Sequence, residues 1–141
     1  METPLQPTQI DILIVCIAAN AALIFVLGLW VSLQRGATKT ISFLAPLDPT
    51  SRMAKVQRAH GNSAEFSGAV IGVLIATKLF AGEPDTPQWM IWTGVAVTAA
   101  RYLQAIGILT CETLEKPHPF KMIGSLITYV GGTALAVGLV A

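Results

Sequence analysis

The feature that most constrains this chain is a long uncharged run close to its amino-terminal end. Residues 12–33 contain no Asp, Glu, Lys, Arg or His. A helix rises about 1.5 Å per residue, so a helix over this run would reach about 33 Å and cross a hydrocarbon core roughly 30 Å thick. The residues before the run lack the positively charged segment of a signal peptide. We therefore expect the run to be kept as a membrane helix.

The composition extends this interpretation to the rest of the chain. Of its 141 residues, 53% are hydrophobic and 12% are charged, whereas a soluble domain usually carries about 25% charged residues. Polar turns marked by Pro and Gly separate four apolar segments. We therefore predict an all-α fold, an integral membrane four-helix bundle in a single domain over residues 1–141. Its four spans are expected at about residues 10–35, 50–81, 87–109 and 119–141.

The charged residues exclude one class of partner and set the orientation. A net charge of +1 without a basic stripe excludes a strongly basic nucleic-acid binder, so we expect no nucleic-acid partner. Basic residues flank the first and third loops, namely Arg35, Lys39, Arg52, Lys55, Arg58, Lys116 and Lys121. The opposite side has only Lys78. Because basic loops stay in the cytoplasm, we expect both termini on the non-cytoplasmic side. The compact loops favour a bacterial inner membrane over the endoplasmic reticulum.

The stretch at residues 58–66, RAHGNSAEF, gathers a guanidinium, an amide and a carboxylate just before an apolar run. On a helix, the i, i+4, i+7 spacing places Arg58, Asn62 and Glu65 on one face. Residues 66–77, which follow, carry no charge. A carboxylate at the edge of such an environment costs several kcal/mol unless it is paired. We therefore expect Glu65 to have a partner or a ligand.

The third span offers that partner, because Arg101 and Gln104 interrupt it. Counted from the outer boundary, Glu65 lies about 25 Å and Arg101 about 20 Å inward. We predict that they face each other, directly or through a bound ligand. Tyr102 neighbours Arg101, and Lys121 opens the fourth span at the same membrane surface. One interpretation is a buried ion pair that locks two helices; the other is a cytoplasmic-side pocket for a small zwitterion with more than one carboxylate.

His60 and the two cysteines favour packing roles over chemistry. His60 lies about 200° around the helix from Arg58 and has no second His or Cys at ligand spacing, so we expect helix packing and no metal site. Cys16 lies among apolar neighbours, where we expect inert packing. Cys111 is placed at a loop and could be exposed.

Two rows of small residues follow i, i+4 spacing in the second and fourth spans. They are Ala64, Gly68, Gly72 and Ala76, and Gly124, Thr128, Gly132 and Ala136. Such rows let helix backbones approach closely in lipid. We expect tight helix packing along them, within or between subunits.

Three motifs resemble those of a known membrane-protein family. RAHGNSAEF, at the start of the second of four short spans, resembles the glutathione-site motif of the MAPEG proteins (membrane-associated proteins in eicosanoid and glutathione metabolism). The ARYLQ stretch at residues 100–104 resembles a motif of the family's leukotriene-synthase branch. Pro119, Phe120 and Lys121 resemble the residues that open its fourth helix. The resemblance covers span number, span order and essentially the whole length of the chain.

The resemblance implies a homotrimer that binds glutathione as a co-substrate between subunits near the cytoplasmic face. The glutathione thiolate would then attack a lipophilic electrophile or reduce a hydroperoxide, as in a glutathione transferase or peroxidase. By motif match the glutathione-binding residues would be Arg35, Arg58, Asn62, Glu65, Arg101, Tyr102 and Gln104, with Arg35 reaching in from the adjacent subunit. Lys121 stands where the family's thiolate-stabilising Arg is expected, so it becomes the catalytic candidate. Gly61 stands where the prostaglandin-synthase branch has a glutathione-binding Arg.

Two other functions compete with this one. The first is a non-catalytic MAPEG-like scaffold that binds membrane lipid or a partner protein. The second is a small-solute transporter or channel subunit, which is disfavoured because the polar residues cluster on the cytoplasmic side and form no continuous path.

Overall fold

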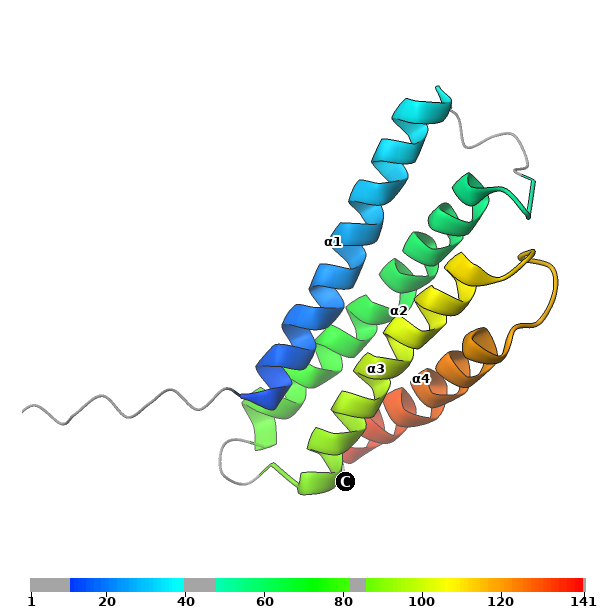
Figure 1. Ribbon diagram of the computed structural model, residues 1–141. Coiled ribbons are helices and arrows are strands. Elements are labelled where there is room, and N and C mark those ends of the chain that lie inside the picture. Colours follow the sequence, from blue (N-terminus) through cyan, green and yellow to red (C-terminus); the bar gives the residue numbers. More distant parts are fainter. Residues whose placement is uncertain (1–10, 40–47, 82–85, 141) are drawn as a thin grey trace, which may run out of the picture.

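The computed structural model describes residues 11–39, 48–81 and 86–140 of the chain. Within these residues it contains four helices: α1 (Ile12–Thr38), α2 (Arg52–Ala81), α3 (Gln88–Thr110) and α4 (Pro119–Gly138). The helices run side by side, each antiparallel to the next in the chain (Figure 1). The all-α, four-helix architecture predicted from the sequence is therefore confirmed for the described residues.

Three of these helices, α1, α2 and α4, are long and apolar enough to cross a membrane. Helix α3 is less apolar because it carries Arg101 and Gln104. Both of these side chains are buried inside the bundle, so these two polar residues face other helices. That α3 forms a fourth span remains a prediction.

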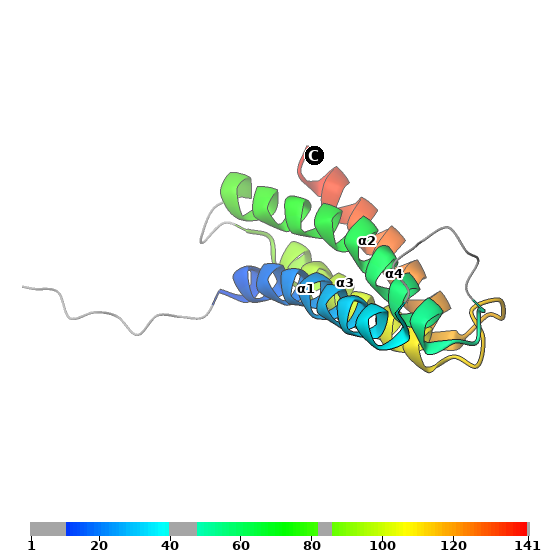
Figure 2. The same cartoon turned by 90° about the horizontal axis from the view of Figure 1, so that it is seen from above.

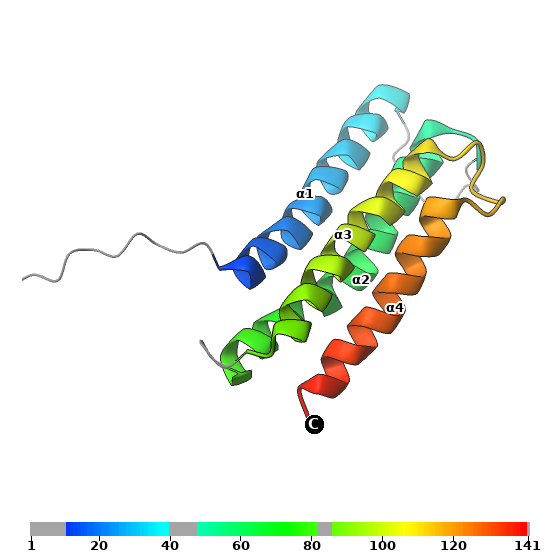
Figure 3. The same ribbon diagram turned by 60° about the horizontal axis from the view of Figure 1, so that its bottom comes forward.

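The helices pack as two pairs that meet across the bundle. Helix α3 packs most extensively against α4, and α1 packs against α2. Seen from above, α2 and α4 lie on one side of the bundle and α1 and α3 on the other (Figure 2). Helices α1 and α4 form opposite flanks (Figure 3), and α2 touches α4 only slightly. This limited α2–α4 contact leaves a groove between the two helices, lined by Phe66, Val73 and Tyr129 among others.

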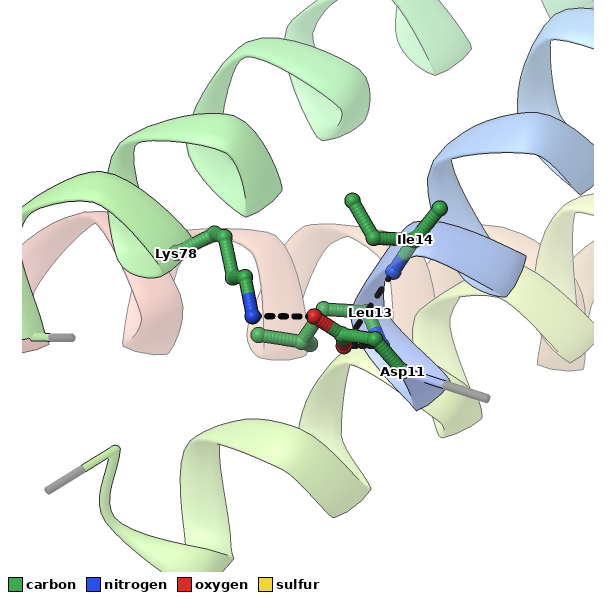
Figure 4. Close-up of polar contacts among 4 residues, drawn as sticks. All are labelled: Asp11, Leu13, Ile14 and Lys78. Atoms are coloured by element: carbon green, nitrogen blue, oxygen red, sulfur yellow. Dashed lines mark hydrogen bonds and ion pairs between the residues drawn. The ribbon is translucent and has the colours of Figure 1, made fainter. Parts of the chain in front are cut away.

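Asp11 fixes the start of α1. Its Oδ1 accepts a hydrogen bond from the backbone N–H of Leu13 at 2.8 Å and a longer one from that of Ile14 at 3.4 Å, which is the N-cap pattern. Its Oδ2 forms an ion pair with Nζ of Lys78 near the end of α2 (Figure 4). The Lys78 ammonium and the two backbone N–H groups lower the pKa of Asp11 from its ordinary value.

Glycines let α3 and α4 approach closely. A Cβ atom added at Gly124 would lie 2.7 Å from the backbone oxygen of Ala100, and one added at Gly107 would lie 2.8 Å from the backbone nitrogen of Lys121. Backbone atoms cannot move aside as a flexible side chain does, so a larger residue would push the two helices apart.

The two predicted rows of small residues differ in what they contact. In α4, Gly124 and Thr128 are buried, whereas a Cβ added at Gly132 would meet no atom within 4 Å. In α2, Cβ atoms added at Gly68 and Gly72 would likewise meet nothing within 4 Å. Within one chain, therefore, the tight packing holds for part of the α4 row, and the α2 row is open.

The buried apolar residues of the described helices form three clusters. Two of them lie at different heights and each join α1, α2 and α3, and the first of these also includes Leu135 of α4. The first cluster comprises Leu13, Cys16, Val70, Leu74, Met90, Val97 and Leu135. The second cluster comprises Leu23, Leu27, Ala59, Ala105 and Ile108. Polar side chains occupy the height between them, and the candidate site belongs to that layer.

The close approach of α3 to α4 can be tested at matched glycines of α4. We expect Gly124→Ala to destabilise the protein by about 1–3 kcal/mol, because the added methyl overlaps backbone of α3. The control, Gly132→Ala, adds the same methyl into open space and should not destabilise, since Ala favours a helix over Gly by about 1 kcal/mol. Thermal unfolding in detergent measures both. Equal effects of the two substitutions would contradict the packing described for α4.

The Asp11–Lys78 contact predicts a pH dependence of stability. A carboxyl whose pKa is lowered by folding stabilises the folded state above its unfolded pKa, roughly 4. That contribution is lost as the pH falls through the folded pKa. Thermal unfolding should therefore show that the wild-type protein loses stability on acidification and that Asp11→Asn loses less. Glu112→Gln, which alters an exposed carboxylate, is the control and should lose as much as the wild type. An Asp11→Asn profile that matches the wild type would argue against this contact.

Candidate functional site

Arg101 is the centre of the polar layer. It lies in the middle of α3 and only 1% of its surface is exposed. One terminal nitrogen donates to the backbone oxygen of Asn62 at 2.8 Å and to its Oδ1 at 2.7 Å. The other donates to Oε1 of Gln104, one turn farther along α3. A planar guanidinium suits this arrangement because its donors point in fixed directions.

The hydrogen bonds continue from α3 to α4. Gln104, having accepted from Arg101 through Oε1, donates through Nε2 to Oγ of Ser125 at 2.7 Å. Gly124 makes this possible, because α4 approaches the backbone of Gln104 closely at that position. We call Asn62, Arg101, Gln104 and Ser125 the polar network. It joins α2, α3 and α4 through the buried side chains of Asn62, Arg101 and Gln104 and the half-buried side chain of Ser125.

Two aromatic rings border the polar network on the α2–α4 side. The guanidinium carbon of Arg101 lies 5.2 Å from the centre of the Phe66 ring, within the range of a cation–π interaction. The Phe66 ring in turn lies 5.4 Å from that of Tyr129 on α4, measured between ring centres. Phe66 is spaced i, i+4 from Asn62, so the two side chains lie on the same face of α2.

The predicted direct pairing of Glu65 with Arg101 is wrong for the single chain. Arg101 uses Asn62 and Gln104 as its acceptors, whereas the Glu65 side chain is exposed. Helix geometry explains the difference, since Glu65 lies about 60° around α2 from Asn62. Counting residues from the membrane boundary predicts the height of Glu65 and of Arg101 along their helices. It does not predict the direction in which each side chain points. An arrangement in which a ligand bridges the two residues stays a prediction.

Arg58 and Glu65 lie on an exposed face of α2, with Asn62 at its buried edge. Because Asn62 Oδ1 accepts from Arg101, its amide group is oriented and its NH2 is the end that can donate to another partner. This face therefore offers a cation, an amide donor and a carboxylate within two turns of helix. It continues into the open row of Gly68 and Gly72.

Tyr102 and Arg35 are not part of the polar network. Tyr102 points toward α1, where its hydroxyl donates to the backbone oxygen of Ala19 at 2.8 Å. Arg35 lies in the last turn of α1. In a single chain these two residues belong to the α1 side of the bundle, and the role expected for Arg35 concerns a neighbouring subunit.

Lys121 holds the connection between α3 and α4. Its Nζ donates to the backbone oxygen of Lys116 at 2.7 Å and, more weakly, to that of Leu114 at 3.4 Å. It also lines a cavity of about 410 Å³ together with Ser125 and Tyr129. A second hollow, of about 290 Å³, lies between α2 and α4 and is lined by Phe66 and Tyr129 among others. Tyr129 thus borders both spaces, and the polar network lies close to them.

The other sequence predictions have mixed outcomes. His60 packs against α1 as expected, since a Cβ added at Gly28 would lie 3.1 Å from its Nε2. Cys16 is buried in the first cluster, also as expected. The expectation that Cys111 could be exposed is wrong: 4% of its surface is exposed. The connection after α3 folds over the end of the bundle, where the Leu114 N–H donates to the backbone oxygen of Pro49 at 3.1 Å. No group of three potential metal ligands occurs among the described residues.

Three residues that border or complete the polar layer were not predicted from the sequence. Phe66 and Tyr129 were not singled out, because aromatic residues are common in membrane helices and carry no distinguishing pattern. Asn20 was also missed, although an amide inside an uncharged span was a usable signal. It is fully buried, and its Nδ2 donates to Oγ1 of Thr98 at 2.9 Å.

The comparison with protein families agrees with the motifs and the geometry. A model of the MAPEG family matches residues 13–141, nearly the whole chain. No curated protein and no solved structure shows significant similarity to this chain. Among the described residues, three helices are apolar and long enough to cross a membrane. The chain therefore belongs to the MAPEG family and is an integral membrane protein.

Proposed function

We propose that this protein is a membrane-bound glutathione transferase or peroxidase that directs the thiolate of glutathione at lipophilic electrophiles. Family membership supports a protein of glutathione or eicosanoid metabolism. The observation that carries the finer proposal is the exposed face of α2, where Arg58 and Glu65 flank an amide oriented by Arg101. The basic residues of the first and third loops support a cytoplasmic position for this face.

The charges on this face complement those of glutathione. Glutathione is a zwitterion with two carboxylates and one ammonium group. Arg58 would bind a carboxylate, Glu65 the ammonium, and the Asn62 amide a carbonyl or carboxylate oxygen. Arg101 and Gln104 would act behind this face, holding Asn62, with Tyr102 beside them on α3. The proposed assembly is the homotrimer implied by the family resemblance, in which glutathione lies between subunits and Arg35 reaches in from a neighbour. The open row of α2 gives room for such a contact between subunits.

Lys121 is the candidate for stabilising the thiolate. An ammonium has three donors, and Lys121 uses two of them on the carbonyl oxygens of Lys116 and Leu114. One N–H thus stays available for a further acceptor. The glutathione thiol would lose its proton to water, and the positive charge of Lys121 would lower the pKa of that thiol. The thiolate would then form a sulfur–carbon bond with the electrophile, whose leaving group departs with the bonding electrons.

The lipophilic substrate would enter from the membrane. The cavity lined by Lys121, Ser125 and Tyr129 also contains the apolar side chains of Met122 and Leu126, both of which are largely exposed on the outside of α4. A substrate dissolved in the bilayer could reach the cavity across this surface without crossing water.

A second function, that of a non-catalytic scaffold, is favoured by the same contacts of Lys121. Two of its donors already hold backbone carbonyls, and it lacks the planar fork of the Arg expected at this position. The scaffold would bind membrane lipid or a partner protein and would not activate a thiol.

Calorimetric titration tests the binding face. We expect Arg58→Ala and Glu65→Gln each to weaken glutathione binding about tenfold or more, because each removes one charge partner worth roughly 1.4 kcal/mol. Glu112→Gln is the matched control for Glu65→Gln, since it neutralises an exposed carboxylate at the end of the bundle. Affinities unchanged by both substitutions on α2 would refute the proposed site.

Ultraviolet absorbance of the thiolate tests the chemical step separately. Adding glutathione to the wild type should produce thiolate absorbance, and Lys121→Ala should reduce it, whereas Lys116→Ala should not. Conjugation of a generic aryl halide should follow the same order. Binding of glutathione without thiolate and without conjugation would leave the scaffold as the function.

A further inference from the structure

The polar layer continues beyond the network, toward α1. In each of α1, α2 and α3, polar residues stand between a residue of the first apolar cluster and a residue of the second. These polar residues are Asn20 in α1, Ser63 and Ser67 in α2, and Thr98 and Arg101 in α3. Because the two clusters each join all three helices, the residues between them lie at a common height.

Four polar atoms of this layer have no hydrogen-bond partner among the described residues. They are Oδ1 of Asn20, Oγ of Ser63, Oγ of Ser67 and Nε of Arg101. The exposed fractions of the four residues are 0%, 1%, 0% and 1%. In a membrane protein each such group costs several kcal/mol if it stays unsatisfied.

The two serines differ from other buried hydroxyl residues of the bundle. Thr77 and Thr128 each satisfy their hydroxyl by donating to the carbonyl four residues earlier, at 2.9 Å and 2.7 Å. Ser63 and Ser67 make no such bond. Their hydroxyls are therefore available to a partner in the interior of the bundle.

We propose that this layer binds internal water between α1, α2 and α3. The four atoms supply what a bridging water requires: Nε of Arg101 is a donor, Oδ1 of Asn20 is an acceptor, and the two hydroxyls can be either. Buried waters typically make about three hydrogen bonds to groups of this kind. The water accepts a hydrogen bond from the Nε–H of Arg101, which has no partner in the polar network. The proposal is independent of glutathione binding.

Water-edited solid-state NMR of the protein in lipid bilayers tests the proposal directly. Magnetisation transferred from water should reach the backbone amides of Ser63, Ser67 and Thr98. It should not reach those of Leu74 and Met90, which belong to the apolar first cluster on the same helices, two turns from the polar layer. Absence of transfer to the polar layer, under conditions that give signals for exposed loop residues, would overturn the proposal.

A substitution gives an independent test through the sign of its effect. If water bridges the hydroxyl, Ser67→Ala should lower the unfolding temperature and weaken the water signal at Ser63 and Thr98. If the hydroxyl has no partner at all, Ser67→Ala should raise the unfolding temperature, because an unpaired buried group is removed. A rise or no change would therefore overturn the proposal. Thr77→Val, which removes a hydroxyl bonded within its own helix, is the control and should leave the water signal of the layer unchanged.

Discussion

A guanidinium buried in the middle of a membrane helix bundle is the constraint on which the rest of this structure depends. An unpaired ion at that depth would cost several kcal/mol, so Arg101 needs an acceptor for each donor. Asn62 and Gln104 accept three hydrogen bonds from Arg101. Gln104 in turn donates to Ser125 on α4. These partners come from three helices, so satisfying one side chain fixes how α2, α3 and α4 sit against one another.

The same constraint separates the buried part of the site from its exposed part. Asn62 is held from behind by Arg101, whereas Arg58 and Glu65, on the same helix, are exposed. The charged side chains that we propose for ligand binding, Arg58 and Glu65, are thus not among those that hold the helices together. Glycines contribute to both parts, since Gly124 lets α4 approach the network, and the row of Gly68 and Gly72 on α2 is open within the single chain.

Much of the fold could be predicted from the sequence, because uncharged runs and Pro–Gly turns locate helices in a membrane protein. Polar residues inside such runs also identified Asn62, Arg101 and Gln104 as a group. What could not be predicted was direction around the helix axis. Depth placed Glu65 and Arg101 at similar heights, but Arg101 bonds Asn62 instead. Cys111 is buried because the connection after α3 folds back, which local sequence does not reveal.

The central claim, that Arg101 and Asn62 act as one unit, is tested most directly by a double-mutant cycle on thermal stability. The cycle compares Asn62→Ala, Arg101→Met and the double variant. If the two side chains are coupled as described, the double variant should lose less stability than the sum of the single variants, by about 1–3 kcal/mol. A stability loss in the double variant that equals the sum of the two single losses to within about 0.5 kcal/mol would contradict this coupling.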